Sequence, residues 1–293
     1  MVKKEIFILI QARITSKRFP NKILEKIGNK IVLDLIYKRL SNIKQKKKIF
    51  FIIPNNKKNQ ELKRFLVKRN YKFFTGSENN VLKRYFLAAK TLKAVHIMRV
   101  TSDCPLIEPN LLNLMIKKYL KSNYDLVSNF FPKKSYPDGF DAEIFNYKAL
   151  AYAFKNAKTK YEKEHVTPFI QKNGKFRIFN VINKIDYSKL RVTLDYKRDL
   201  KKLNEIYKRL NFVKFQDNLN WIADEAFMDN KLEGDSIATM SKGPNEIRTR
   251  AFKNNRLSYL PLKEGVESIG SGAFANNKIV SLALPKGLKR VGE

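Results

Sequence analysis

The chain of 293 residues is poor in cysteine and in long apolar runs. Its single cysteine, Cys104, excludes a disulfide within the chain, as is usual for proteins of a reducing compartment. No stretch approaches the roughly 18 consecutive apolar residues of a membrane helix. The apolar stretch at residues 6–10 is followed at once by charge and is too short for the core of a signal peptide. These absences predict a cytoplasmic protein with no membrane partner.

Acidic residues are also scarce, since 27 Asp and Glu face 60 Lys and Arg, which gives a formal net charge of +33. Such a charge can mark a polyanionic partner, or it can reflect a composition rich in Lys, Asn, Ile and Phe. The basic residues are dispersed along the chain, with no arginine-rich tail or basic arm. We therefore favour compositional bias and expect no nucleic-acid partner. A steep salt dependence of DNA binding would favour the other interpretation.

The first two thirds of the chain alternate apolar strands with amphipathic helices. Expected strands lie at 5–10, 49–53, 72–74, 94–100, 124–129, 141–146, 176–182 and 190–195. Expected helices lie at 30–42, 57–69, 79–92, 109–121, 147–157, 162–172 and 197–210. Continuously apolar strands indicate a sheet that is covered on both faces. The pattern predicts an α/β fold with a doubly wound, mostly parallel sheet.

After about residue 215 the pattern changes to a repeat. Residues 222–232, 247–257 and 269–279 align, and their Ala-Phe pairs begin at 226, 251 and 273. A period in this range predicts a short solenoid whose units stack on one another. We thus expect two domains, residues 1–215 and 216–293. Because the chain ends where the next Ala-Phe pair is due, we expect a truncated repeat array or a chimeric gene.

A basic segment, QARITSKRFPNKIL at residues 11–24, follows the first predicted strand. In open α/β sheets ligands bind beyond the carboxyl ends of the strands, so this loop would face the ligand crevice. Backbone amides together with Arg13, Ser16, Lys17, Arg18 and Lys22 would suit a triphosphate. The segment has neither GxxxxGK[ST] nor GxGxxG, which excludes the P-loop and the dinucleotide fingerprint. From the residues alone, a phosphate loop and a solvated basic turn both remain open.

Two aspartates stand at the ends of predicted strands. Asp103 and Asp195 could converge on one Mg²⁺, which takes one or two carboxylates together with phosphate oxygens. The alternative for each is a helix N-cap, since Pro105 and Tyr196 begin turns into helices. A second acidic group, in YPDGFDAEIF, could suggest paired carboxylates of a glycosidase. His165 is either a substrate contact or an ordinary helix-surface or core histidine.

Five blocks in order resemble the sugar-acid cytidylyltransferases. These blocks are QARITSKRFPNKIL, TGSENNVLKRY, RVTSDCPLIEP, YPDGFDAEIF with EKEHVTPFI, and RVTLDYKRDL. The chain looks most like the spore coat polysaccharide biosynthesis cytidylyltransferases, which are related to the 3-deoxy-manno-octulosonate and acylneuraminate enzymes. The resemblance covers about residues 1–212 and implies a nucleotide-diphospho-sugar transferase-like fold. The repeats resemble BspA-type leucine-rich repeats, with the pattern IxxxAFxxNxL.

The resemblance implies a role for each matching residue. Catalytic residues would be Arg13, Lys22 and Asp103. Nucleotide-binding residues would be Ala12, Arg13, Ser16, Arg18, Lys22, Ser77 and Asp103. The Mg²⁺ ligands would be Asp103 and Asp195, and the sugar contacts would be Asp138, Asp141, Glu143 and His165. Thr15 and Asn21 stand where such enzymes usually carry glycine, and asparagine tolerates a positive φ more readily than threonine.

The implied reaction transfers CMP from CTP to an acidic sugar and releases pyrophosphate, for surface polysaccharide or glycan biosynthesis. The implied partners are CTP and the acidic sugar, with a homodimer as the assembly. The alternative is an interaction protein, in which leucine-rich repeats bind a protein partner and the nucleotidyltransferase-like domain is inactive. Retention of both Asp103 and Asp195 favours a working enzyme.

Overall fold

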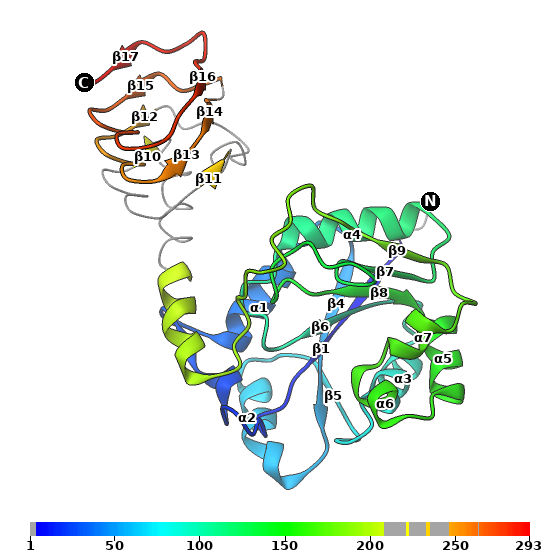
Figure 1. Ribbon diagram of the computed structural model, residues 1–293. Coiled ribbons are helices and arrows are strands. Elements are labelled where there is room, and N and C mark those ends of the chain that lie inside the picture. Colours follow the sequence, from blue (N-terminus) through cyan, green and yellow to red (C-terminus); the bar gives the residue numbers. More distant parts are fainter. Residues whose placement is uncertain (1–3, 208–220, 223–232, 235–245, 263) are drawn as a thin grey trace. The chain divides into compact units, whose positions relative to one another are not determined.

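The computed structural model describes residues 4–207, 221–222, 233–234, 246–262 and 264–293 (Figure 1). The chain divides into two compact units, one up to Asn204 and one from Glu205 onward. The domain boundary predicted between residues 215 and 216 lies outside the described residues. None of the described helices is long and apolar enough to cross a bilayer.

The first unit is built on a seven-stranded sheet with the order β5-β4-β1-β6-β8-β7-β9. Every neighbouring pair is parallel except the two that β8 makes, with β6 and with β7. The strands are β1 (Ile6–Gln11), β4 (Lys47–Pro54), β5 (Phe73–Gly76), β6 (His96–Thr101), β7 (Leu126–Ser128), β8 (Glu143–Asn146) and β9 (Ile178–Asn180). The predicted doubly wound, mostly parallel sheet is confirmed.

The helices begin where the sequence supplies caps. Asn80 and Asn146 accept hydrogen bonds from backbone N–H groups of the first turns of α3 and α5, and Thr159 with Glu162 forms a capping box on α6. The helices are α1 (Val32–Ser41), α2 (Gln60–Lys68), α3 (Val81–Thr91), α4 (Pro109–Lys121), α5 (Tyr147–Asn156), α6 (Lys160–His165) and α7 (Pro168–Lys172). Residues 197–207 are also helical.

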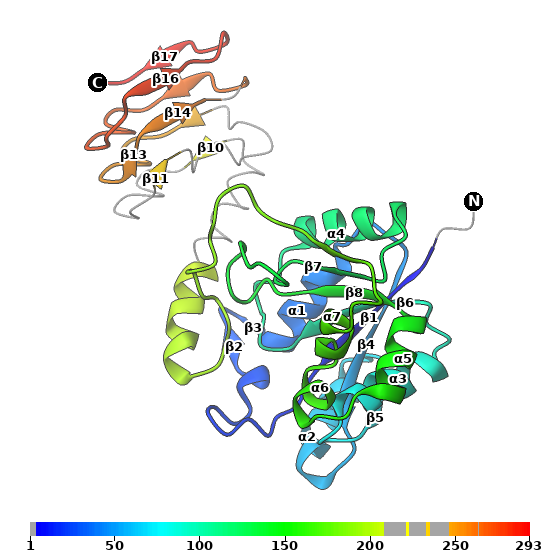
Figure 2. The ribbon, with the colours of Figure 1, turned by 45° about the vertical axis from the view of Figure 1, so that its right-hand side comes forward.

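Helices cover the two faces of the sheet as separate groups. Helices α3, α5, α6 and α7 gather on one face, as Figures 1 and 2 show, and apolar residues of α3, α5 and α7 pack with Leu9, Ile97 and Phe145 of the sheet. Helices α1 and α4 lie together on the other face, where Arg39 of α1 donates to the carbonyl of Ile107 just before α4. This leaves the carboxyl ends of β1, β4 and β6 open at one edge of the sheet.

Two predicted elements differ from the structure. The single helix expected at 162–172 is divided into α6 and α7, because Val166 adopts a left-handed φ of 74°. Residues 190–195 form no strand; only Arg191 bridges, to Asp138. The reason is that this segment bonds to two separate loops, through Val192 N to the Asp138 carbonyl and Leu194 N to the Asp103 carbonyl. Residues 190–195 therefore connect two loops by backbone hydrogen bonds and do not belong to the sheet.

The second unit consists of short parallel strands in register. β10 (Trp221–Ile222), β12 (Glu246–Ile247), β15 (Ser268–Ile269) and β17 (Arg290–Val291) form one sheet in that order. Two further parallel pairs join β11 (Glu233–Gly234) to β13 (Arg256–Leu257) and β14 (Tyr259–Pro261) to β16 (Ser281–Ala283). The Ala-Phe pair at 251–252 is fully buried, and the ring of Phe252 stacks on that of Phe274 in the next repeat.

Asn277 ties one repeat to the previous one, since its amide donates to the Phe252 carbonyl and its Oδ1 accepts from Leu257 N. We expect Asn277→Ala to destabilise this unit by about 1–3 kcal/mol, because these partly buried backbone groups lose their partner. Hydrogen–deuterium exchange of peptides from residues 246–293 over a series of urea concentrations measures this. Lys278→Ala, at an exposed neighbouring position, is the control. Equal unfolding midpoints for the two variants would contradict the expectation.

Candidate active site

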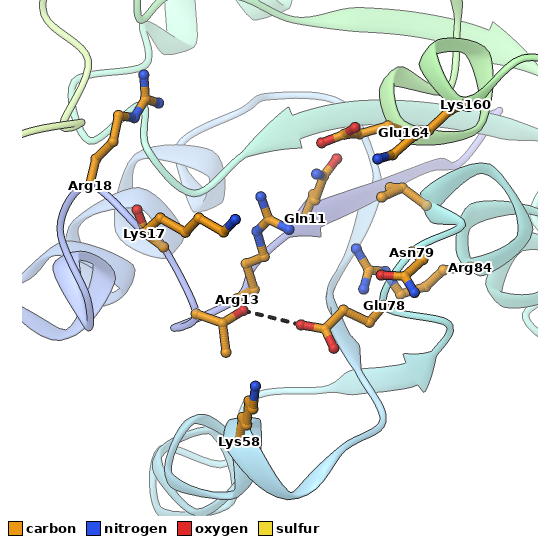
Figure 3. Close-up of a pocket in the computed structure, with 13 residues that line it drawn as sticks. Gln11, Arg13, Lys17, Arg18, Lys58, Glu78, Asn79, Arg84, Lys160 and Glu164 are labelled. Atoms are coloured by element: carbon orange, nitrogen blue, oxygen red, sulfur yellow. Dashed lines mark hydrogen bonds between the residues drawn. The ribbon is translucent and has the colours of Figure 1, made fainter.

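A cleft of about 910 Å³ lies beyond the carboxyl end of β1 (Figure 3). Its lining comes from the end of β1 and the basic loop after it, the segment after β4, the loop between β5 and α3 with the first turn of α3, and helix α6. The lining residues are Gln11, Arg13, Thr15, Ser16, Lys17, Arg18, Lys58, Glu78, Asn79, Val81, Arg84, Lys160 and Glu164. A cavity of about 140 Å³ shares Gln11, Arg13, Ser16 and Arg18 with it and adds Lys22, Thr101, Ser102 and Asp103.

The basic loop has a fixed conformation. Ile14 N donates to Oδ1 of the buried Asn59, and Asn21 N donates back to the Ile14 carbonyl at 3.1 Å. Asn21 has the left-handed φ of 57° that its place in a glycine position requires. Thr15 has no positive φ, and its hydroxyl donates to Glu78 Oε1. The two departures from glycine are therefore both accommodated by the loop.

The two predicted metal-binding aspartates lie on either side of one ammonium group. Lys22 Nζ is 3.0 Å from Asp195 Oδ1 and 3.6 Å from Asp103 Oδ2, and Arg18 Nη2 is 2.6 Å from Asp195 Oδ1. The hydrogen bond from Leu194 N to the Asp103 carbonyl, 2.9 Å long, brings the two loops together. Burial alone would raise the pKa of Asp195, but Lys22, Arg191 and Arg18 outweigh it and hold that pKa below its usual value.

The helix-cap alternative is wrong for both aspartates. The Asp195 carboxylate bonds to Lys22, Arg18 and Arg191 and accepts no bond from the following helix. Asp199, inside that helix, accepts from the backbone N–H groups of Asp195 and Tyr196. Asp103 lies well ahead of α4, which begins at Pro109. Both carboxylates thus face the cations of the basic loop.

The pair Asp103 and Asp195 fits a divalent cation that arrives with a triphosphate. Among the described residues no cluster of three or more His, Cys, Asp or Glu side chains could hold a metal. Mg²⁺ does not need one, because it commonly binds one or two carboxylates and completes its shell with phosphate oxygens and water. The ammonium of Lys22 between the two carboxylates shows that this position favours positive charge.

Arg191 forms ion pairs with three carboxylates, and the sequence analysis did not identify it. Its Nη2 is 2.8 Å from Asp195 Oδ2, its Nη1 is 3.0 Å from Asp199 Oδ1, and its Nε is 3.6 Å from Asp138 Oδ2. The spacing Arg191, Asp195, Asp199 in RVTLDYKRD was the available signal. Arg191 connects the metal-side aspartate with the loop that carries Asp138.

The predicted sugar contacts fall into two groups. Lys134 Nζ lies 2.8 Å from Asp138 Oδ1 and 3.0 Å from Asp141 Oδ2, so these three residues form one cluster. Glu143 is fully buried, and its carboxylate accepts from Arg99, Thr167 and Gln171. In this structure these bonds connect β8 to β6 and to the start of α7, and the expected sugar contact of Glu143 remains a prediction.

The remaining predicted residues lie around the cleft without lining it. His165 lies at the surface at the end of α6, and its ring centroid is 4.6 Å from that of Tyr161. Neighbouring protein atoms exclude part of the solvent around the ring, and this desolvation lowers its pKa. Ser77 uses its hydroxyl to accept from Asn80 N. Ala12 is buried, and its N–H donates to the Ile52 carbonyl in β4.

Asp141 provides a pH-dependent test of the cluster around Lys134. Burial is the main cause that raises its pKa to about 6, and Lys134 only partly opposes it. A raised pKa means that proton binding favours the folded state at low pH, and this contribution disappears as pH rises through about 6. We therefore compare the free energy of unfolding of Asp141→Asn with that of the unaltered protein at each pH. The difference, variant minus unaltered, should be about 2 kcal/mol more positive at pH 7 than at pH 4. Urea unfolding of both proteins at the two pH values measures this, and a pH-independent difference would contradict it.

Two protein-family models match this chain. The cytidylyltransferase model matches residues 7–225, which includes every residue of the cleft. The chain belongs to the cytidylyltransferase family. A model of the BspA type leucine rich repeat region matches residues 205–293 in six copies. This cytidylyltransferase therefore carries leucine-rich repeats after its nucleotide-binding fold, and the predicted family and fold class are confirmed.

Two curated relatives and two solved structures are similar to this cytidylyltransferase. An uncharacterized protein of Methanocaldococcus jannaschii is 34% identical over 71% of this chain and 86% of its own length. The spore coat polysaccharide biosynthesis protein SpsF of Bacillus subtilis is 27% identical over 70% and 87%. A cytidylyltransferase from Leptospira borgpetersenii is 29% identical, with a TM-score of 0.64 over 70% of this chain and 94% of its own. A CMP:2-keto-3-deoxy-manno-octonic acid synthetase complexed with CTP shares the fold, at 13% identity and a TM-score of 0.53 over 70% and 99%.

Proposed function

We propose that this cytidylyltransferase transfers CMP from CTP to an acidic sugar and releases pyrophosphate. One observation carries the proposal: Lys22 lies between the carboxylates of Asp103 and Asp195, beside a cleft lined by Arg13, Lys17 and Arg18. A triphosphate needs cations around it and carboxylates on its metal side, and this site offers both. Because these cations and both carboxylates are present, we favour a working enzyme over an inactive domain that only carries repeats.

In the proposed reaction the sugar hydroxyl oxygen bonds to the α-phosphorus as the bond to pyrophosphate breaks, and the hydroxyl proton passes to solvent water. Arg13, Ser16, Arg18 and Lys22 would bind the phosphate oxygens and stabilise the negative charge that moves onto the leaving pyrophosphate. Asp103 and Asp195 would hold Mg²⁺, which when bound supplies Lewis-acid stabilisation of the phosphate oxygens. The fixed loop around Asn21 would keep the cations in place before the nucleotide binds.

The loop with Lys134, Asp138 and Asp141 is the proposed sugar side. Arg191 ties this loop to Asp195, which supports an acceptor that binds next to the metal-side carboxylate. Lys134 is the cation that pairs with Asp138 and Asp141, and it would face the sugar carboxylate. A role in surface polysaccharide biosynthesis is supported by the similarity to SpsF of Bacillus subtilis.

The test is a screen for pyrophosphate release with each of the four nucleoside triphosphates, Mg²⁺ and a panel of sugar acids with their neutral counterparts. We expect release only with CTP and a carboxylate-bearing sugar. Release with neutral sugars alone would exclude the acidic-sugar proposal. No release from any combination, by folded protein that binds CTP, would exclude the nucleotidyl-transfer proposal.

A further inference from the structure

The backbone at Val166 adopts a rare and strained conformation. Its φ of 74° and ψ of −56° lie close to those of a γ-turn of the strained kind, and Thr167 N donates to the His165 carbonyl at 2.9 Å, which closes the turn. Among the described residues with a positive φ, Val166 alone is β-branched, which makes this conformation especially unfavourable. Such strain persists only where the surroundings impose it, and it is concentrated at functional sites.

Contacts on the α7 side of the turn impose this conformation. The Val166 side chain is fully buried in the apolar cluster on this face of the sheet. Thr167 Oγ1 donates to Glu143 Oε2 at 2.9 Å, and Gln171 Nε2 donates to Glu143 Oε1 at 2.8 Å. Glu143 is itself fully buried and paired with Arg99. A shift of α7 that relieved the strain would therefore break buried hydrogen bonds to the sheet.

The strained turn gives α6 its direction. No residue of this six-residue helix is buried, although the helix lies against α3. Its end is joined directly to the turn, since Val166 N donates to the Glu162 carbonyl at 3.1 Å. A helical φ at Val166 would continue α6 into α7 as the single helix that the sequence pattern predicts. The positive φ instead breaks the helix axis, so the position of α6 depends on the turn.

Helix α6 brings two charged side chains to the cleft. Lys160 and Glu164 are four positions apart and so share one face of the helix, and both line the cleft together with Arg13 and Lys17. Figure 3 shows Lys160 pointing into the cleft on the side away from Arg18. The charge of Lys160 therefore adds to those of Arg13 and Lys17 toward an anionic ligand in this cleft.

We propose that Val166 is a positioning residue, whose strained turn holds Lys160 of α6 in the cleft to bind the nucleotide. The Val166 side chain is fully buried and contacts no substrate, so its effect passes through the backbone of α6. The bonds from Thr167 and Gln171 to Glu143 maintain the strain, and loss of one of them lets α6 move. The inference rests on the proposed binding of CTP in this cleft and adds the residues that place one wall of it.

A double-mutant cycle with the full chain tests whether the turn acts through Lys160. Isothermal titration calorimetry with CTP and Mg²⁺ measures the dissociation constant. We expect Lys160→Ala to raise it about tenfold, through loss of one charged contact. Thr167→Val, which removes the hydroxyl bond to Glu143, should raise it to a similar extent. The double variant should then bind CTP no more weakly than Lys160→Ala alone, because the two changes remove the same contact.

Two controls separate this positioning role from a loss of folded protein. Thr167→Ser keeps the hydroxyl and should bind CTP as the unaltered protein does. Lys158→Ala removes an exposed cation just before α6 that does not line the cleft, and it should leave the dissociation constant unchanged. Additive effects of Thr167→Val and Lys160→Ala, or unchanged binding in Thr167→Val, would overturn the inference. If the unaltered protein does not bind CTP, the proposed function itself is wrong.

The pair Val166→Gly and Val166→Ala tests the strain itself. Glycine adopts a φ of 74° freely whereas alanine does not, so the glycine variant should unfold at the higher urea concentration and bind CTP more tightly. At a helical φ the order of the two stabilities would be reversed, and that result would overturn the inference. This pair also decides the question if Thr167→Val does not fold.

Discussion

Replacing Asp103 with alanine should lower kcat for pyrophosphate release from CTP by at least about 10³-fold. Asp103 follows β6 directly, and Lys22 lies between its carboxylate and that of Asp195. Removal of one carboxylate takes away half of the negative charge that would hold the divalent cation against the triphosphate. Such a loss of transition-state charge stabilisation corresponds to about 4 kcal/mol.

The matched control for this prediction is Asp186→Asn. Asp186 is an aspartate of the same unit whose carboxylate accepts from Ser188 N, away from the cleft lining. Steady-state assays over a range of Mg²⁺ concentrations distinguish a metal role from a structural one, since weaker metal binding is partly overcome at high Mg²⁺. An Asp103→Ala enzyme within tenfold of the unaltered kcat would contradict the assignment of Asp103.

Glu143→Ala should destabilise the first unit by about 3–5 kcal/mol. The Glu143 carboxylate is fully buried and pairs with Arg99, whose Nη1 is 3.1 Å away. Thr167 and Gln171 also donate to it, so the substitution leaves one buried cation and two polar groups without their acceptor. Urea unfolding followed by circular dichroism at 222 nm reports on this unit, because the described helices belong to it.

The double variant Arg99→Met with Glu143→Leu separates the buried charge from the lost volume. Removing both partners leaves no isolated buried ion, so the double variant should be less destabilised than Glu143→Ala alone. If both variants unfold at the same urea concentration, the ion pair contributes nothing beyond side-chain volume. A Glu143→Ala protein as stable as the unaltered chain would contradict this structural role and would favour the predicted sugar contact of Glu143.

The sequence patterns predicted the sheet well because its central strands β1, β4 and β6 are apolar runs of six to eight residues that alternate with helices. β1, β4 and β6 end where the polar residues begin, so the position of the basic loop and of Asp103 followed from chain order alone. The segment 190–195 was misassigned, because its apolar alternation resembles a strand while its hydrogen bonds go to two distant loops. Local pattern does not distinguish these cases, since the partners are far away in the sequence.

The convergence of Asp103 and Asp195 was foreseen, but the residues that set their environment were not. Arg191 and Arg84 are two of 60 basic residues, and the sequence alone does not distinguish them from the others. Arg84 is buried and bonds to the Ser77 carbonyl, and Arg191 pairs with Asp138, which lies 53 positions away in the sequence. Likewise, Glu143 alternates with apolar residues in β8, and only the fold shows that Arg99 in the neighbouring strand neutralises it.

Because Arg191 bonds to Asp138, Asp195 and Asp199 at once, these three positions form one thermodynamic unit. Their single substitutions will not be additive, since removal of any one carboxylate redistributes the same guanidinium among the other two. Under the proposed sugar role of the Asp138 loop, a substitution of Asp138 that altered acceptor preference would also change the partners left to Asp195 and Asp199. Substitutions in this loop would then be tolerated best where the new side chains still pair with Arg191.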